Sequence, residues 1–279
     1  MPYEDLHEIR KMTRRGYQES IREEEARAAS IRESEGDALQ ALLGAAAELG
    51  YGPDEIALLP EGIDVLDGCG NPLAVSDIKP GSAVMVAGCR TGADCFIAGM
   101  SAGKKGLVVG IEEAPEDVTK ARGAARSFKS GTVEIRPGEC ENLPAADKSF
   151  DVVITNCAVT FSYDKARVLK ELGRVLKSGG RLILCEPAIT KEAAASKKRA
   201  AVAAAEFLEN AFKKEDIRKA IKKAGFKKIS IVDETAMPAA RILRDKRVQA
   251  ALVSGEMSQE AAADLASTIV SVKIIATRP

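Results

Sequence analysis

The chain has no excess of charge of either sign, because its 279 residues include 41 lysines and arginines and 41 aspartates and glutamates. A balanced chain offers no broad field that would attract nucleic acid or an anionic membrane surface. It also contains no apolar run of about eighteen residues, the length that a membrane-spanning helix needs. The first twenty residues lack the apolar core of a signal peptide. We therefore expect neither nucleic acid nor a membrane as a partner, and a cytoplasmic location.

Histidine is almost absent, and His7 lies in a charge-rich segment that favours a surface helix. A histidine is therefore not expected in the site. Six cysteines are present without any CxxC pair: Cys69, Cys89, Cys95, Cys140, Cys157 and Cys185. In a chain without a signal peptide they should be mostly reduced thiols, available for packing, soft-ligand binding or redox chemistry.

Composition divides the chain into three parts. Residues 1–50 are charge-rich and helix-favouring, whereas glycines and prolines punctuate residues 51–80. The first part is predicted to be helical and the second to be a loop-rich connector of the kind that serves a site. Residues 81–279, in a chain with 46% hydrophobic content, are expected to form one domain. A helical insertion is expected within it near residues 233–266.

From residue 83 onward, apolar runs alternate with helix-favouring stretches, which is the pattern of an α/β fold with a doubly wound sheet. Parallel strands are expected over residues 83–87, 106–111, 133–136, 151–155 and 180–185. Helices are expected near 94–102, 116–128, 164–176 and 191–209. A helix over 215–224 should end at Gly225 and be followed by strands over 228–232 and 268–277.

A glycine-containing turn joins the first expected strand to its helix, and Glu112 ends the second strand. Gly88 and Gly92 let the backbone approach a ligand, and the amides of the helix start can face a carboxylate of that ligand. A carboxylate at the tip of the second strand can accept both hydroxyl groups of a ribose. The order predicts a nucleoside site, although it also suits a plain strand-to-helix turn that has lost its ligand.

Several short sequence motifs resemble those of the prokaryotic arsenite methyltransferases, a family of the class I S-adenosylmethionine methyltransferases. They are GYG, LLPEG, the GCGNP element at residues 68–72, IKPG, GADCF, GECENLP, ITNCAV and RVLKSGGRLIL. The likeness covers residues 50–186 well and the closing SVKIIATRP more loosely. It implies a Rossmann-like sheet of seven strands with the last strand antiparallel, and an enzyme that uses S-adenosylmethionine.

The same resemblance assigns a cofactor site and a substrate site. The cofactor residues would be Gly88, Gly92, Asp94, Glu112, Glu139, Cys140 and Asn156. The family carries essential thiols at the positions of Cys69 and Cys157. Thiolates hold trivalent arsenic well because it is soft and pyramidal, and its lone pair stays free to attack a sulfonium methyl group in line. The other cysteines are expected to serve packing.

The chain departs from the family pattern at three positions. Val86 and Arg90 replace an acid before the turn and a glycine within it, and Phe207 stands where a third thiol would align. The Arg90 side chain would either crowd the methionine part of the cofactor or turn outward. Capture of arsenic by three thiolates would then need Cys89 or an exogenous thiol.

Three functions therefore stay open. The first is methyl transfer from S-adenosylmethionine to arsenite, a metalloid substrate held by Cys69 and Cys157. The second is methyl transfer to a small organic molecule, which the apolar Phe207 favours. The third is a catalytically degenerate protein that binds a metabolite, a metalloid or a protein partner. The sequence leaves the oligomeric state undetermined.

Overall fold

The computed structural model describes residues 37–63, 65, 68–190, 211–237, 246–255 and 257–279. His7, Phe207 and the helix expected over 191–209 lie outside the described residues. All six cysteines lie within them. Among these residues, no helix is long and apolar enough to cross a bilayer.

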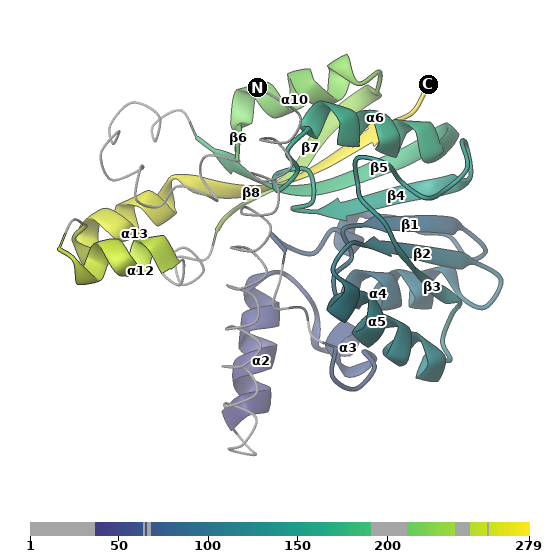
Figure 1. Cartoon of the computed structure of the whole chain (residues 1–279), viewed down its shortest axis with the longest axis horizontal. Coiled ribbons are helices and arrows are strands. Elements are labelled where there is room, and N and C mark those ends of the chain that lie inside the picture. Colours follow the sequence, from purple (N-terminus) through teal and green to yellow (C-terminus); the bar gives the residue numbers. More distant parts are fainter. Residues whose placement is uncertain (1–36, 64, 66–67, 191–210, 238–245, 256) are drawn as a thin grey trace.

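One mixed sheet forms the centre of the molecule (Figure 1), in the order β3-β2-β1-β4-β5-β8-β7. Its first five strands are parallel: β1 (Ala83–Ala87), β2 (Leu107–Glu112), β3 (Val133–Pro137), β4 (Phe150–Asn156) and β5 (Leu176–Ile189). Strand β8 (Ile269–Thr277) runs antiparallel between β5 and β7 (Lys227–Ala236). A two-residue strand, β6 (Phe212–Lys213), pairs with the end of β5. The predicted doubly wound sheet with an antiparallel last strand is confirmed.

Helices cover both faces of the sheet, which explains why its central strands are apolar without alternation. One face carries α4 (Ala93–Ala102) and α5 (Pro115–Ser127), together with α2 (Asp37–Glu48), α3 (Pro53–Ala57) and a 3-10 turn at Leu73–Val75. The other face carries α6 (Lys165–Val175) and α10 (Lys214–Lys223) (Figure 1). Two separate apolar cores result, one on each face of the sheet.

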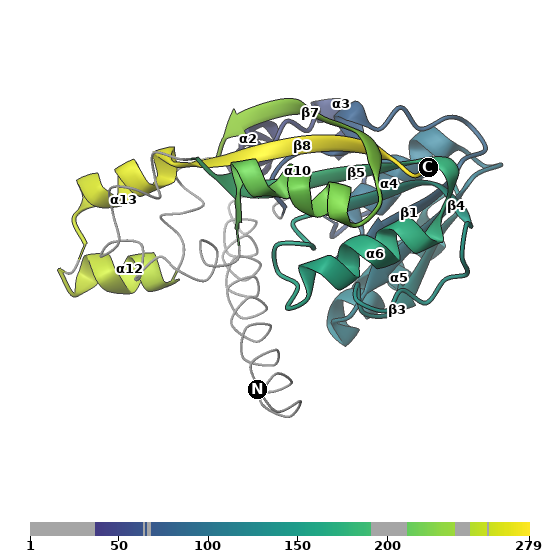
Figure 2. The same cartoon turned by 90° about the horizontal axis from the view of Figure 1, so that it is seen from above.

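The segment between β7 and β8 begins after residue 236, later than the start near residue 233 that was expected for the insertion. Strand β7 continues through Ala236, so residues 233–236 belong to the sheet, where they pair with β8. Two short helices, α12 (Lys246–Val253) and α13 (Gln259–Ser267), then follow. Figures 1 and 2 show both helices at the end of the sheet where β8 begins.

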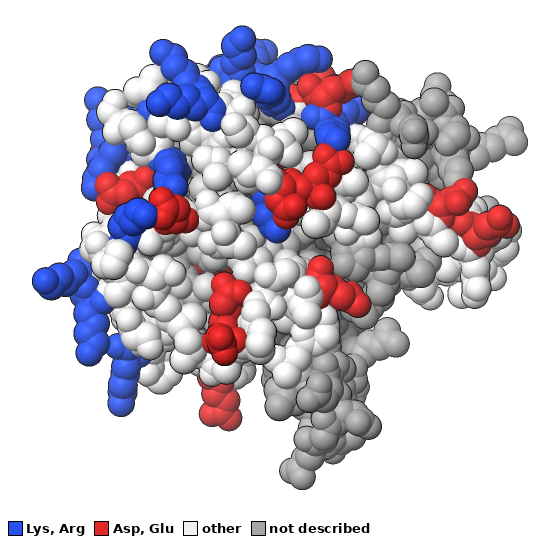
Figure 3. Space-filling model, turned by 180° about the vertical axis from the view of Figure 1, so that it is seen from behind, with Lys and Arg blue, Asp and Glu red and all other residues white. Residues whose placement is uncertain are grey.

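The surface agrees with the balanced composition. On the face shown in Figure 3, lysine and arginine side chains lie among aspartate and glutamate side chains. Exposed ion pairs of the described residues include Lys219 with Asp216 and Arg136 with Glu134. Such exposed pairs add little to stability, typically about 0–1 kcal/mol each.

Candidate cofactor and thiol site

The turn between β1 and α4 brings the backbone close to the rest of the site. Gly88 and Gly92 have φ values of +70° and +95°, which side chains rarely adopt. A Cβ atom on Gly88 would lie 2.7 Å from the Cβ of Ala158. The amides of Gly88 and Cys89 both donate to the carbonyl of Ile111 at the end of β2. The turn is therefore held against β2, beside the predicted ribose acid.

Glu112 lies at the tip of β2, and its carboxylate is fixed by three backbone amides. Oε2 accepts from Arg90 N at 2.8 Å, while Oε1 accepts from Glu113 N at 2.8 Å and Ala114 N at 2.9 Å. The side chain is half-buried. These bonds keep an acceptor at the carboxyl edge of the sheet, where doubly wound folds bind nucleosides.

The Arg90 side chain packs against α5. Its backbone has a φ of +47°, and its Nε lies 3.6 Å from Asp117 Oδ2, with both side chains mostly buried. Of the two orientations considered from the sequence, the outward one is therefore not adopted. Val86, the second divergent residue, is buried within β1.

Asp94 is buried at the start of α4 among neutral donors. Tyr51 OH donates to Oδ1 at 2.7 Å, and Asn156 Nδ2 donates to Oδ2 at 3.2 Å. Burial raises the pKa of Asp94 to about 6, although both hydrogen bonds act in the opposite direction. A buried carboxylate whose described hydrogen-bond partners are neutral is well matched to an ammonium group. This feature fits the α-ammonium of S-adenosylmethionine, as Glu112 fits its ribose.

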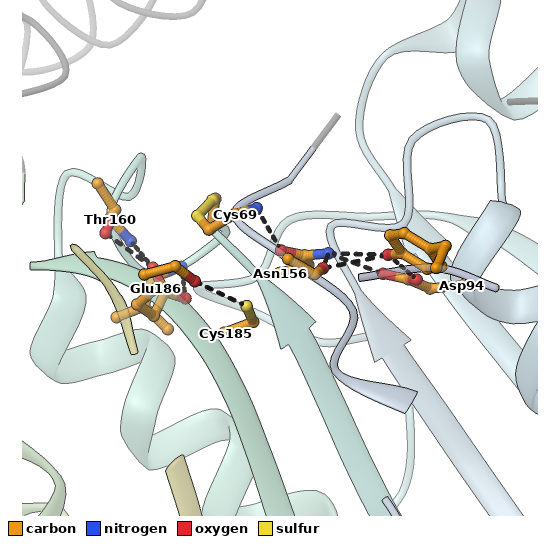
Figure 4. The surroundings of a disulfide bond; sticks show 11 residues. Cys69, Asp94, Asn156, Thr160, Cys185 and Glu186 are labelled. Atoms are coloured by element: carbon orange, nitrogen blue, oxygen red, sulfur yellow. Dashed lines mark hydrogen bonds between the residues drawn. A yellow bond between two sulfur atoms is a disulfide. The ribbon is translucent and has the colours of Figure 1, made fainter. Parts of the chain in front are cut away.

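Asn156 joins Asp94, which belongs with Glu112 to the cofactor half of the site, to the connector (Figure 4). Its Oδ1 accepts from Cys69 N at 2.7 Å, and its Nδ2 donates to Gly70 O at 2.9 Å as well as to Asp94. The GCGNP element is thus docked directly on the end of β4. Tyr51, which the sequence did not single out, belongs to the same network.

Cys69 and Cys157 are joined by a disulfide, with Cα atoms 6.1 Å apart and a sequence separation of 88. Both are buried, and Cys157 adopts a φ of +67° just after β4. The other four cysteines are thiols outside any disulfide, as expected, whereas this pair differs from the expected reduced state. The structure brings the two predicted arsenic ligands together, in their oxidised form.

A third cysteine, Cys185, lies in the same apolar cluster as the disulfide. Cys157 N donates to Cys185 O at 2.8 Å, and the Cys185 sulfur would be 3.2 Å from a Cβ on Gly70. Burial raises the pKa of this thiol to about 12. Cys185 was predicted from the sequence to serve packing, yet the parallel register of β4 and β5 pairs it with Asn156. That register is the signal that could have placed Cys185 beside the predicted site.

Apolar residues from the β7–β8 connection complete this cluster. They are Met237, Val248, Met257, Ala262 and Ala266, all buried. The helical insertion therefore packs on the cysteines rather than on the cofactor turn.

Glu186, the residue after Cys185, is a buried acid that sequence reasoning missed. Its carboxylate accepts from Val159 N at 3.2 Å, Thr160 N at 3.0 Å and Thr160 Oγ1 at 2.7 Å. Burial raises its pKa from 4.5 to about 7. It fastens the loop that follows Cys157 onto β5. Its signal in the sequence was an acid directly after an apolar run, as for Glu112, although Glu186 lies within β5.

The remaining predicted site residues lie apart from the disulfide. Glu139 is exposed and pairs with Asn142, whereas Cys140 is half-buried and lies near Gly88. Cys89 and Cys95 occupy the core beneath the turn, where their sulfur atoms would both lie 2.7 Å from a Cβ on Gly110. Their interaction and their burial raise the pKa of Cys89, which agrees with a packing role.

A family model described as a methyltransferase domain matches residues 78–230, more than half of the chain. The chain belongs to the methyltransferase domain family. The predicted methyltransferase class is confirmed by this membership. The match begins in the connector before β1 and ends within β7. It therefore includes the turn, Glu112, Asn156 and Glu186.

The methyltransferase domain is also similar to curated arsenite methyltransferases. The one from Halobacterium salinarum is 41% identical over 138 residues, which are 50% of this chain and 35% of that protein. The one from Aquipseudomonas alcaligenes is 35% identical over 122 residues, 41% of this chain and 35% of that protein. The matched region thus spans about a third of each relative's length.

Among solved structures, the fold resembles an arsenic(III) S-adenosylmethionine methyltransferase from Chlamydomonas reinhardtii. The TM-score is 0.58 at 24% identity, covering 84% of this chain and 72% of the other. The YcgJ protein of Bacillus subtilis gives a TM-score of 0.60 at 15% identity, covering 74% of this chain and 95% of the other. At these identities the likeness supports the predicted fold.

Proposed function

We propose that the methyltransferase domain transfers a methyl group from S-adenosylmethionine to a small soft nucleophile held between Cys69 and Cys157, with trivalent arsenic as the substrate that fits best. The observation that carries this proposal is the meeting of these two cysteines at the end of β4, directly beside Asn156. The similarity of the chain to curated arsenite methyltransferases supports it.

The residues of the cofactor half have separate roles in this proposal. When bound, S-adenosylmethionine supplies an electrophilic methyl group on its sulfonium. Glu112 accepts hydrogen bonds from the ribose hydroxyls, and Asp94 pairs with the α-ammonium. Gly88 and Gly92 leave room for the ligand along the turn, and Cys140 packs beside the turn where the adenine is expected.

The thiol half captures the acceptor after the disulfide is opened. A dithiol reductant supplies two electrons and two protons, the S–S bond breaks, and Cys69 and Cys157 become thiols. Two thiolates then hold trivalent arsenic and leave its lone pair available for in-line attack. The third sulfur position is assigned to Cys185 or to an exogenous thiol, because Cys89 belongs to the core beneath the turn.

A small uncharged organic acceptor is the second candidate. The apolar cover from the β7–β8 connection, with Met237 and Met257 beside the cysteines, favours a ligand of low polarity. Under this alternative the disulfide has a structural role and methyl transfer does not require its reduction.

Calorimetric titration with S-adenosylmethionine and S-adenosylhomocysteine is the first test. Failure of both to bind at millimolar concentration would leave the catalytically degenerate function. If they bind, the reduced protein is incubated with arsenite and alkylated. We expect protection of Cys69 and Cys157, with methylated arsenic formed by the wild type and by Cys95→Ala but not by Cys69→Ser or Cys157→Ser. Unchanged labelling of both cysteines would favour the organic acceptor.

A further inference from the structure

The side-chain amide of Asn156 contacts both halves of the site. Its Oδ1 accepts from Cys69 N at 2.7 Å, and its Nδ2 donates to Asp94 Oδ2 at 3.2 Å. Asp94 is the carboxylate that suits the cofactor ammonium, and Cys69 is half of the disulfide. One amide therefore links the predicted cofactor group to a cysteine of the disulfide.

Tyr51 provides a second connection between the same two elements. Its hydroxyl donates to Asp94 Oδ1 at 2.7 Å and lies 3.2 Å from Gly70 O, which follows Cys69 directly. The tyrosine is buried. Both oxygens of Asp94 are thus oriented by residues whose other contacts lie on the GCGNP element.

The packing around this network leaves little room for independent movement. Gly68 has a φ of +92°, and a Cβ there would lie 2.5 Å from Asn156 Cγ. A displacement of the GCGNP element therefore changes the position of the Asn156 amide.

The disulfide is the covalent restraint on this same element. Cys69 is held by the disulfide bond to Cys157. Its backbone amide also donates a hydrogen bond to Asn156, the residue before Cys157. Because all six cysteines lie in described residues and the other four are not in a disulfide, this is the one disulfide of the chain. Reduction removes the covalent restraint and leaves only the hydrogen bonds.

We propose that Asn156 and Tyr51 are positioning residues that couple the redox state of the Cys69–Cys157 pair to cofactor affinity. This inference rests on the proposed cofactor site. The disulfide holds the GCGNP element against β4, which keeps the Asp94 carboxylate oriented before the cofactor arrives. A pre-oriented carboxylate binds with less loss of conformational freedom, so the oxidised protein binds the cofactor more tightly. By thermodynamic linkage, the cofactor favours the disulfide by the same factor.

The test measures S-adenosylhomocysteine affinity of the full chain by calorimetry before and after reduction with dithiothreitol. Reduction transfers two electrons and two protons to the protein and converts the reagent to its cyclic disulfide. We expect affinity about tenfold tighter for the oxidised form, which is within the usual range of coupling. Reciprocally, saturating S-adenosylhomocysteine should lower the thiol–disulfide potential by about 30 mV, the equivalent of a tenfold factor for two electrons.

Variants then test which residues carry the coupling. Tyr51→Phe and Asn156→Ala should each bring the affinity ratio toward one, whereas Tyr163→Phe on the surface should leave it unchanged. The double variant Cys69→Ser with Cys157→Ser should bind S-adenosylhomocysteine with the affinity of the reduced wild type. Dithiothreitol should not change that affinity.

Each outcome has a separate meaning. Equal affinity of the oxidised and reduced wild type overturns the coupling while leaving the cofactor site intact, and that comparison needs no variant. A ratio that persists in both Tyr51→Phe and Asn156→Ala overturns the assignment to these residues. If S-adenosylhomocysteine binds neither the oxidised nor the reduced protein, the proposed function is overturned together with the coupling.

Discussion

The backbone amide of Arg90 donates to Glu112 Oε2 at 2.8 Å, so the most divergent residue of the turn directly holds the predicted ribose acid. The bond comes from the main chain, and any residue at this position except proline can make it. The side chain of Arg90, which pairs with Asp117 on α5, is therefore not required for the position of Glu112.

Arg90→Gly should stabilise the folded chain and change S-adenosylhomocysteine affinity little. Arg90 has a φ of +47°, a conformation that glycine adopts without strain, and the relief contributes about 1 kcal/mol to stability whether or not the ligand is bound. The lost ion pair with Asp117 is long and offsets only part of this gain. Lys228→Gly is the matched comparison, since Lys228 also has a positive φ but lies on β7, and it should gain stability as well. Urea unfolding measures both variants, and a less stable Arg90 variant would contradict the prediction.

Gly88→Ala should reduce cofactor affinity by tenfold or more. The substitution places a Cβ 2.7 Å from that of Ala158, so the turn must shift from the position that is proposed to receive the cofactor. It also imposes a side chain on a φ of +70°, which costs about 1–3 kcal/mol of stability. Gly123→Ala serves as the control, because Gly123 lies in α5 with nothing within 4 Å of an added Cβ. That control should gain roughly 0.5–1 kcal/mol of stability in urea unfolding and bind normally.

Glu186→Gln should remove part of the pH dependence of stability. The folded-state pKa of Glu186, about 7, exceeds its ordinary value of 4.5 because the carboxyl is buried. Between these values the folded chain holds a proton that the unfolded chain has lost, so stability falls as pH rises from about 4.5 to about 7. The size of this fall is on the order of 3 kcal/mol.

Urea unfolding at pH 5 and pH 8 measures this effect. Asp94, whose pKa is raised to about 6, contributes in the same direction, so the variant should keep some dependence. The exposed Glu260 offers a control, and Glu260→Gln should retain the wild-type difference. An identical pH dependence in Glu186→Gln would show that the carboxyl does not titrate in this window.

Val248→Ala should expose the free thiol of Cys185 to alkylation. Val248 is fully buried in the apolar cluster that contains Cys185, so its truncation opens a gap and costs roughly 1–2 kcal/mol locally. Val253, on the same helix, is 87% exposed and supplies the matched control. Mass spectrometry after iodoacetamide treatment should show faster labelling of Cys185 in Val248→Ala only. Equal rates in the two variants would mean that α12 does not shield the thiol.

Much of the fold could be predicted because alternating apolar runs and glycine turns are local signals. The five parallel strands and the antiparallel closing strand follow from them. The extension of β7 through Ala236 could not be predicted, because exposed residues such as Glu234 and Thr235 give no apolar pattern. Their pairing with β8 depends on tertiary contact.

The candidate site was only partly predictable for a related reason. Glycines and strand-end acids can be recognised by their position, and Glu112 was predicted in this way, whereas Asn156 was predicted from the family resemblance. Tyr51 and Cys185 reach the site from distant segments by burial and register, which no local pattern encodes. The pairing of Cys69 with Cys157 likewise depends on how the connector docks on β4.

The antiparallel direction of β8 determines where new sequence can enter the methyltransferase domain. Because β7 and β8 are joined at the carboxyl edge of the parallel strands, any segment inserted between them is delivered beside the cysteines. The cofactor turn lies on the opposite half of the sheet, between β1 and α4. Changes in this one hairpin therefore alter the surroundings of the cysteines without altering the turn between β1 and α4.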